Sequence, residues 1–322
     1  MPAHASRQPD WMARLRLPLI AAPMLRVSGP ALVEAAMAAG VVGAFPTANA
    51  RDVAELDHWL GRIGAAAAAR GDADGAPCCP NLIIRQPRMR DDLACLVRHR
   101  VHMVITSVGS PAEVVGPLHD VGATVFADVA TVAHAEKAVR AGADGLVLLT
   151  AGAGGQTGWM NPFAFVRAVR AGFDGPIVLA GGISDGHALW AARALGCDLA
   201  YMGTKFIATR ESMASDAYRR MLVEAGMDDV LLTRAFTGLP TNMLRPSILA
   251  AGLDPERLDE EVTPASAREA FGGGEAPEGR RRWADIWSAG HSVSGVDGIH
   301  SVADLVERTR MEYEAARGAN PA

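Results

Sequence analysis

"PIVLAGGISDGHALWAARALGCDLAYMGT", residues 176–204, decides the fold, because it contains one complete strand–helix–strand unit. Two apolar runs, 176–181 and 199–204, enclose an amphipathic segment that ends at Gly196. Strands covered on both faces are apolar nearly throughout, and a glycine commonly ends a helix that leads back to the next strand. The stretch therefore predicts two parallel strands joined by a helix.

The same unit recurs along the chain from residue 17 onward. Eight such units over about 210 residues are typical of a compact (β/α)8 TIM barrel, whose usual size is ~250 residues. A doubly wound open sheet is the alternative, because periodicity cannot show closure, but no G-x-G-x-x-G turn follows the first run. The predicted strands are 17–24, 41–46, 80–84, 103–108, 124–129, 145–150, 176–181 and 199–204. We expect Ser28 to cap the first of the intervening helices.

The chain changes character after residue 227. Residues 230–290 are rich in proline and contain the run Gly272–Gly274, and a final helical pattern covers residues 301–318. We therefore predict two parts. Residues 1–227 form the barrel, and residues 228–322 form a partly helical extension that packs over the barrel mouth and includes the closing helix.

Composition excludes several classes of function. With 31 basic and 36 acidic residues the net charge is −5, so no broad positive field attracts nucleic acid. The short run Arg280–Arg282 predicts a solvated helix start. No apolar stretch approaches the ~20 residues of a membrane span, and the first residues lack a signal-peptide core. We expect a cytoplasmic protein with a small-molecule substrate and no nucleic-acid or membrane partner. Whether it forms a homodimer stays open.

The four cysteines predict neither a metal site nor a disulfide framework. They show no CxxC spacing, and the adjacent pair would clamp a tetrahedral metal poorly. We interpret them as buried free thiols in a reducing compartment. They are Cys78, Cys79, Cys95 and Cys197.

The carboxyl ends of the predicted strands carry the signals for a site. In a (β/α)8 barrel these ends build the active site, and the loops after strands seven and eight are the usual phosphate seat. Here those loops contain Gly181–Gly182 and Gly203–Thr204, where bare backbone can approach an anion and a hydroxyl can donate. The first strand ends in an apolar shelf, Ala22–Pro23–Met24. A phosphate with an apolar shelf opposite suggests a flat phosphorylated cofactor, and FMN fits.

At this point the chain resembles the FMN-dependent nitronate monooxygenases, formerly called 2-nitropropane dioxygenases. The resemblance rests on AAPM (21–24), Asn81, GADGLVLLTAGAGG (142–155), PIVLAGGISDG (176–186), GCDLAYMGTKFIAT (196–209), FTG (236–238) and DIWSAG (285–290). That family includes NAD(P)H:quinone reductases and flavin enoyl-thioester reductases. The resemblance implies FMN held by segments at Pro23–Met24, Asn81, Gly154–Gly155, Gly181–Gly182 and Gly203–Thr204.

Two positions depart from the family pattern. Members that oxidise nitronates have a histidine at the position that matches Gln156, and a histidine of pKa about 6.5 can remove a substrate proton. Gln156 can only donate or accept hydrogen bonds. After DIWSAG the family commonly has glutamine, whereas this chain has His291. Our hypothesis is that Gln156 and His291 are the catalytic pair and have exchanged places around one flavin face. The alternative is that His291 is structural.

Asp128, at the end of the fifth predicted strand, is a further candidate. A carboxylate near FMN can hold a ribityl hydroxyl, or act as a base if burial raises its pKa. A third interpretation is an N-cap of the following helix. We predict the ribityl role.

Three functions fit these residues. The first is oxidation of alkyl nitronates, in which O2 reoxidises the FMN. The second is NAD(P)H-dependent reduction of a quinone or of an α,β-unsaturated thioester, in which Gln156 polarises a carbonyl. The third is a catalytically silent flavin-binding protein. We predict an FMN oxidoreductase of the nitronate monooxygenase type, with the reductase as the main alternative.

Overall fold

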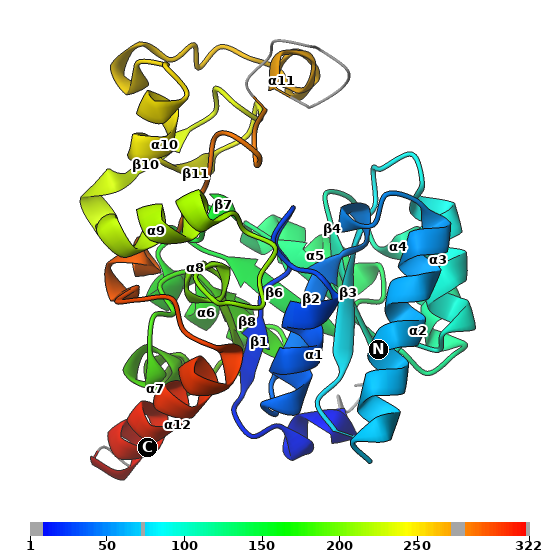
Figure 1. Cartoon of the computed structure of the whole chain (residues 1–322). Coiled ribbons are helices and arrows are strands. Elements are labelled where there is room, and N and C mark those ends of the chain that lie inside the picture. The colour runs from blue at the N-terminus through cyan, green and yellow to red at the C-terminus, as the bar shows by residue number, and fades with distance from the viewer. Residues whose placement is uncertain (1–8, 72–74, 272–280, 320–322) are drawn as a thin grey trace.

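Parallel pairing of the last barrel strand with the first closes the sheet (Figure 1). The computed structural model describes residues 9–71, 75–271 and 281–319. All eight barrel strands overlap the predicted runs, which confirms the (β/α)8 barrel and shows that the open-sheet alternative is wrong. The strands are β1 (Leu19–Ala21), β2 (Val42–Pro46), β3 (Cys78–Ile83), β4 (Met103–Ser107), β5 (Thr124–Val129), β6 (Gly145–Leu149), β8 (Ile177–Ala180) and β9 (Leu199–Met202).

Seven helices follow the barrel strands and cover the outside of the sheet. Their apolar sides pack on the strands, and several begin at side-chain caps such as Asp52, Thr131 and Asp185. The helices are α1 (Pro30–Ala38), α2 (Val53–Ala69), α3 (Met89–Arg98), α4 (Ala112–His119), α5 (Val132–Arg140), α6 (Pro162–Arg170) and α7 (Gly186–Leu195).

The eighth place in the ring is filled from the end of the chain. Only the four-residue helix α8 (Thr204–Ile207) follows β9 directly. The closing helix α12 (Val302–Ala319) packs against both α7 and α1, and Figure 1 shows it beside α7. Helix α12 therefore lies in the barrel's ring rather than with the extension, and the predicted boundary at residue 227 does not separate the two parts.

Residues between α8 and α12 build the extension, which stands above the barrel in Figure 1. Its core is a three-stranded sheet in the order β10 (Val230–Thr233), β11 (Thr241–Leu244), β7 (Gly155–Gln156). Strand β7 comes from the glycine-rich loop after β6, so the sheet joins the extension to the barrel. The helices are α9 (Asp216–Glu224), α10 (Arg245–Ala250) and α11 (Pro264–Phe271), with 3-10 turns η3 (Met227–Asp229), η4 (Pro255–Arg257) and η5 (His291–Gly295).

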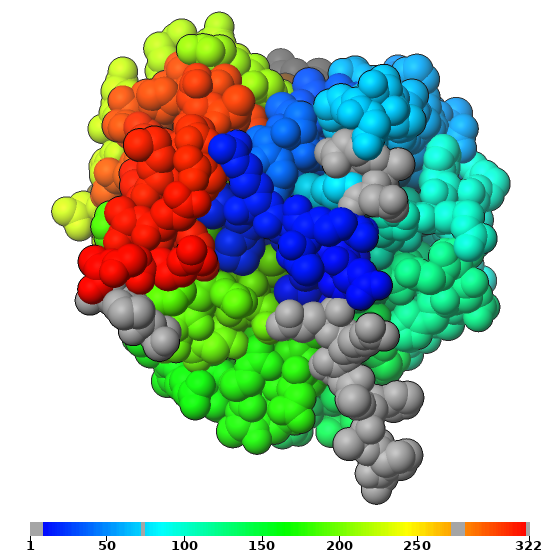
Figure 2. Space-filling model, turned by 90° about the horizontal axis from the view of Figure 1, so that it is seen from below, coloured from blue at the N-terminus to red at the C-terminus, as the bar shows by residue number. Residues whose placement is uncertain are grey.

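The N-terminal segment closes the opposite end of the barrel. The 3-10 helix η1 (Asp10–Arg14) places the buried Trp11 ring 6.4 Å from the Phe126 ring on β5. Figure 2, seen from below, shows this segment across the middle of that face. A further 3-10 turn, η2 (Thr47–Asn49), follows β2. With its lower end filled, the barrel opens at the carboxyl ends of its strands.

Among the helices of the described ranges, none has both the length and the apolar character that crossing a bilayer requires.

Gly186 tests how α12 is fitted into the ring. A Cβ atom at Gly186 would lie 2.1 Å from the backbone nitrogen of Tyr313 and 2.4 Å from the carbonyl oxygen of Thr309, both on α12. We expect Gly186→Ala to push α12 away and cost about 1–3 kcal/mol of stability. The thermal unfolding midpoint measures this.

Gly64→Ala is the matched control, because Gly64 lies on the exposed side of α2 and a Cβ atom there meets nothing within 4 Å. That change should leave stability the same or raise it by up to ~1 kcal/mol, since alanine favours helix. A Gly186→Ala protein as stable as the wild type would contradict the tight fit of α12.

Candidate active site

A cavity of about 420 Å³ lies where the barrel strands end, between the barrel loops and the extension. Of the predicted site residues, all except His291 line it, although they come from six different strand ends and are spread over more than half of the chain. This first cavity is of a size typical for cofactor sites. The predicted residues in its wall are Ala22, Pro23, Met24, Asn81, Asp128, Gly154, Gly155, Gln156, Gly181, Gly182, Gly203 and Thr204.

The side chains of Ser28 and Asn49 hold the shelf after β1. The Ser28 hydroxyl accepts a hydrogen bond from the Met24 backbone nitrogen at 3.1 Å and donates to the Ala22 carbonyl at 3.2 Å. The Asn49 amide donates to the Met24 carbonyl at 2.9 Å. The predicted helix cap at Ser28 is wrong, since Gly29 takes the cap position of α1 without a side-chain bond. Ser28 instead fixes the shelf.

The two glycine corners provide the bare backbone that a phosphate needs. Gly181 and Gly182 have φ of 127° and 76°, a region that favours glycine, and a Cβ at Gly182 would meet nothing within 4 Å. At the second corner the Thr204 hydroxyl accepts a hydrogen bond from the Gly290 backbone nitrogen at 3.0 Å, which leaves its own proton free to donate. The corners therefore fit the phosphate of FMN.

The start of α7 is not part of this phosphate seat. The Asp185 carboxylate accepts from the Ala188 backbone nitrogen at 2.8 Å, and Glu312 accepts from the Gly186 nitrogen at 2.9 Å. Two carboxylates thus occupy the helix start, so an anion would be held by the corner loops alone.

Gln156 is positioned by the extension. In the β7–β11 pair Gln156 faces Thr241 and Gly155 faces Asn242, whose side-chain amide donates to the Ala153 carbonyl at 2.7 Å. Gly155 has φ of 69°, which turns the loop into the pair. The Gln156 side chain is exposed at the cavity wall. The extension therefore holds a neutral amide over the opening of the barrel.

Two polar atoms in the cavity wall are buried without a hydrogen-bond partner among the described residues. They are Asp128 Oδ1, at the end of β5, and the Tyr201 hydroxyl on β9. Buried polar groups are normally paired, so an orphan in a cavity points to a ligand. Burial raises the pKa of Asp128 to about 7. Thr131, not Asp128, caps α5, so the N-cap alternative is wrong.

His291 lies outside the cavity wall. Its backbone nitrogen donates to the Gly152 carbonyl at 2.9 Å. Its ring packs against the same glycine, because a Cβ atom on Gly152 would lie 2.7 Å from His291 Nδ1. The structure thus brings Gln156 to the site and places His291 behind the glycine loop, so the exchange of the two residues stays a prediction.

A second cavity of about 580 Å³ adjoins the first. Both are lined by Asp128 and Gln156, and by Val108. Val108 has φ of 54°, a strained conformation for a β-branched residue, and such strain gathers at functional sites. Because the two cavities share a wall, a substrate can lie in the second cavity beside a cofactor bound in the first.

The sequence interpretation missed several cavity residues. Tyr201 stands two positions before a predicted corner, and its place in an apolar strand hid it. Arg268, Arg282 and Trp283 reach the cavity from the extension. The run Arg280–Arg282 was a usable signal, but its predicted role as a solvated helix start is wrong for Arg282, which is half-buried; Arg280 lies outside the described residues.

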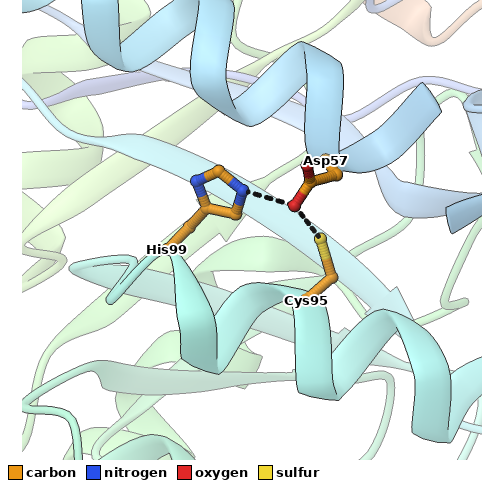
Figure 3. Close-up of side chains that lie close together, drawn as sticks. All are labelled: Asp57, Cys95 and His99. Atoms are coloured by element: carbon orange, nitrogen blue, oxygen red, sulfur yellow. Dashed lines mark hydrogen bonds and ion pairs between the residues drawn. The ribbon is translucent and has the colours of Figure 1, made fainter. Parts of the chain in front are cut away.

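A separate cluster lies between α2 and α3, outside both cavities (Figure 3). One oxygen of Asp57 contacts His99 Nε2 at 3.0 Å and Cys95 Sγ at 3.8 Å. Arg98 donates to the same oxygen at 2.9 Å, so a cation already pairs with this carboxylate. The cluster acts as a link between helices. All four cysteines are free. The predicted burial is confirmed for Cys79, Cys95 and Cys197, whereas Cys78 is half-buried.

Comparison with known proteins identifies the family of the chain. A sequence model of the family described as nitronate monooxygenase matches residues 73–309. That match covers most of the chain and includes every glycine corner of the first cavity.

The chain belongs to the nitronate monooxygenase family.

The relatives differ in the activities that their names give. A nitronate monooxygenase of Paraburkholderia phytofirmans is 28% identical, over 93% of this chain and 94% of its own. A (3aS,4S,5R,7aS)-5-hydroxy-7a-methyl-1-oxo-octahydro-1H-indene-4-carboxyl-CoA dehydrogenase of Mycobacterium tuberculosis is 27% identical over 72% of this chain, and the match spans 64% of that relative's length. The solved structure of FabK from Thermotoga maritima superposes with a TM-score of 0.80 at 26% identity, covering 96% of this chain and 97% of FabK.

Asp128 predicts a specific dependence of stability on pH. Its folded pKa of about 7 lies above the ordinary aspartate value of 3.8, so the folded chain binds more protons between these pH values and stability falls as pH rises through this window. Asp128→Asn removes the charge and with it the penalty. For the flavin-free protein at pH above about 7, the variant should be more stable by on the order of 2–4 kcal/mol, and near pH 4 the two proteins should be alike.

Thermal midpoints across this pH range measure the effect. Asp120→Asn, at an exposed position, is the control and should follow the wild type. If Asp128→Asn has the same pH profile as the wild type, the carboxyl is not destabilised by burial.

Proposed function

We propose that this protein is an FMN-dependent oxidoreductase that reduces the C=C bond of an α,β-unsaturated thioester with NADH or NADPH. The observation that carries the proposal is Gln156, an exposed amide held at the cavity wall by β11. An amide can donate a hydrogen bond to a thioester carbonyl, but it cannot take a proton. The name of the Mycobacterium tuberculosis relative, a carboxyl-CoA dehydrogenase, supports a thioester substrate.

The residues of the first cavity fit FMN. The glycine corners Gly181–Gly182 and Gly203–Thr204 hold its phosphate, and the shelf Ala22–Met24 packs on its ring system. Asp128 Oδ1, which has no partner among the described residues, accepts from a ribityl hydroxyl. When bound, FMN supplies hydride transfer between the nicotinamide and the substrate.

Gln156 acts on the substrate carbonyl in this reaction. Its side-chain N–H groups donate to the thioester oxygen, and the polarised carbonyl makes the β-carbon a better hydride acceptor. The β-carbon gains the hydride and the α-carbon gains a proton, while NAD(P)H becomes NAD(P)⁺. Because Gln156 has no titratable proton, that proton comes from another group or from water.

Oxidation of alkyl nitronates with O2 is the second candidate, and the family match and the Paraburkholderia phytofirmans relative favour it. A nitronate is already ionised, so it needs an oxygen-binding donor rather than a base. Gln156 meets that need, whereas it cannot deprotonate a neutral nitroalkane.

Anaerobic mixing separates the two candidates. We expect NADH or NADPH to bleach the flavin, and crotonyl-CoA to restore its colour. Bleaching by propyl-2-nitronate with no response to either nicotinamide would replace the first candidate by the second. An oxidised flavin that responds to none of these reagents would contradict both and leave a silent flavin-binding protein.

Gln156→Ala should affect one half-reaction only. Loss of a single carbonyl donor costs roughly 10²-fold in rate, so stopped-flow reoxidation of the flavin by crotonyl-CoA should slow by that factor. Reduction by the nicotinamide should be unchanged, since Gln156 contributes nothing to it. Equal loss in both half-reactions would show that the substitution disturbs the flavin site instead.

Gln156→His provides the matched gain of function. A histidine here can remove a proton near neutral pH, so this variant should consume neutral nitroalkanes that the wild type leaves untouched. Oxygen uptake with 2-nitropropane measures the gain. No uptake by the histidine variant would mean that position 156 does not face the reacting carbon.

A further inference from the structure

Two arginines of the extension reach into the first cavity. Arg268 lies on α11 and is exposed at the rim, and Arg282 is half-buried after the end of α11. The Arg282 backbone nitrogen donates to the carbonyl of Phe271, the last residue of α11, at 3.0 Å. This bond ties the backbone of Arg282 to the end of α11, the helix that carries Arg268.

Neither arginine has a carboxylate partner within the described residues. Arg282 Nη1 donates to the Phe236 carbonyl at 2.9 Å, and that is the side-chain bond it makes. Other arginines of the extension differ. Arg245 pairs with Glu256, and Arg281 pairs with Asp285 at 3.3 Å. The extension therefore supplies carboxylates to some of its arginines, whereas the two in the cavity wall have none among the described residues.

The cavity concentrates positive charge in a chain whose net charge is −5. Burial lowers the pKa of Arg282, and the nearby charge of Arg268 lowers it further. Asp128 is the one acidic side chain among the described residues of the wall, and its pKa of about 7 leaves it partly neutral. The half-buried Arg282 loses hydration next to the charge of Arg268 and gains no carboxylate, so an anion that binds there would lower the free energy of the site.

The turn that carries Arg282 is strained and fixed. Trp283 has φ of 67°, which is rare for a bulky residue, and its backbone nitrogen donates to the Ile286 carbonyl at 2.9 Å. The Trp283 ring also approaches Gly155, next to Gln156. Strain of this kind persists where the surroundings enforce it, and here it accompanies a turn that places Arg282 and Trp283 in the same cavity wall as Gln156.

We propose that Arg268 and Arg282 form a subsite for a phosphate group of the second substrate. The inference rests on the proposed function, because that function assigns the FMN phosphate to the glycine corners and leaves the arginines for the second substrate. Figure 1 shows α11 in the extension and α8, which follows the second corner, in the barrel, so the two anion sites come from different parts of the chain. Two guanidinium groups match the charge and the several oxygens of a phosphate. The phosphate belongs to a coenzyme A thioester or to the nicotinamide dinucleotide.

Isothermal titration calorimetry on the purified holoprotein tests the subsite without any turnover. Coenzyme A, NADP⁺ and propionate are the probes, since the oxidised dinucleotide carries the same phosphates as NADPH and cannot reduce the flavin. We expect at least one of the two phosphate ligands to bind, with Arg268→Gln weakening it about tenfold, the effect of losing one charge-assisted contact. Arg268 is exposed and unpaired, so this variant should fold normally. Arg282→Gln should weaken binding by at least as much, since Arg282 is more buried.

Arg245→Gln is the matched control, because Arg245 lies in the same extension but outside the cavity wall. It should bind like the wild type. Loss of coenzyme A affinity in the cavity variants assigns the phosphate to the thioester, and loss of NADP⁺ affinity assigns it to the dinucleotide. Three results would overturn the proposal. They are affinities for both phosphate ligands that neither cavity variant changes, no binding of either phosphate ligand, and propionate binding as tight as that of the phosphate ligands.

The failure of the proposed function has a different signature. If arginine-dependent binding of a phosphate ligand is present but crotonyl-CoA never reoxidises the flavin, the reductase assignment falls and the subsite stands. If crotonyl-CoA reoxidises the flavin but substitution of either arginine leaves ligand affinity unchanged, the reductase assignment stands and the subsite is wrong.

Discussion

The pairing of β7 with β11 is the interaction on which the site depends. A glycine-rich loop at the end of a barrel strand would be free to adopt many conformations, because glycine restricts the backbone least. Here its last two residues become a strand of the extension's sheet, and Asn242 holds the preceding carbonyl. The entropy of the loop is lost once, on folding, so Gln156 meets a ligand in a preset position.

The cavity wall contains buried polar groups that lack the partners such groups normally have in protein interiors. Asp128 Oδ1 and the Tyr201 hydroxyl are buried without a hydrogen-bond partner in the described chain. The half-buried Arg282 guanidinium donates to a backbone carbonyl but has no carboxylate partner there. Each lowers the stability of the ligand-free protein. A ligand that satisfies them recovers this free energy on binding, so occupancy and stability are linked in this fold. The site therefore exchanges stability for affinity, as binding sites commonly do.

The barrel could be predicted from the sequence because its signals are local. Each buried strand is an apolar run, and a glycine or a short turn precedes the next, so all eight were found, as was the cavity that their carboxyl ends form. The extension's sheet could not be found in this way. Its strands 230–233 and 241–244 are short, and the third, Gly155–Gln156, lies far away in the sequence and has no β propensity. Likewise, nothing local in the run at Arg280–Arg282 distinguishes a solvated charge from one that the chain folds over a cavity.

The position of α12 in the ring has a consequence for how such proteins diversify. Because the last helix returns to the barrel, the extension is an insertion with both ends anchored on the scaffold, rather than a tail. An inserted segment can lengthen, shorten or exchange its sequence while the barrel keeps its closure. Substitutions in the extension can then change substrate preference, while the barrel loops that line the cofactor cavity stay the same.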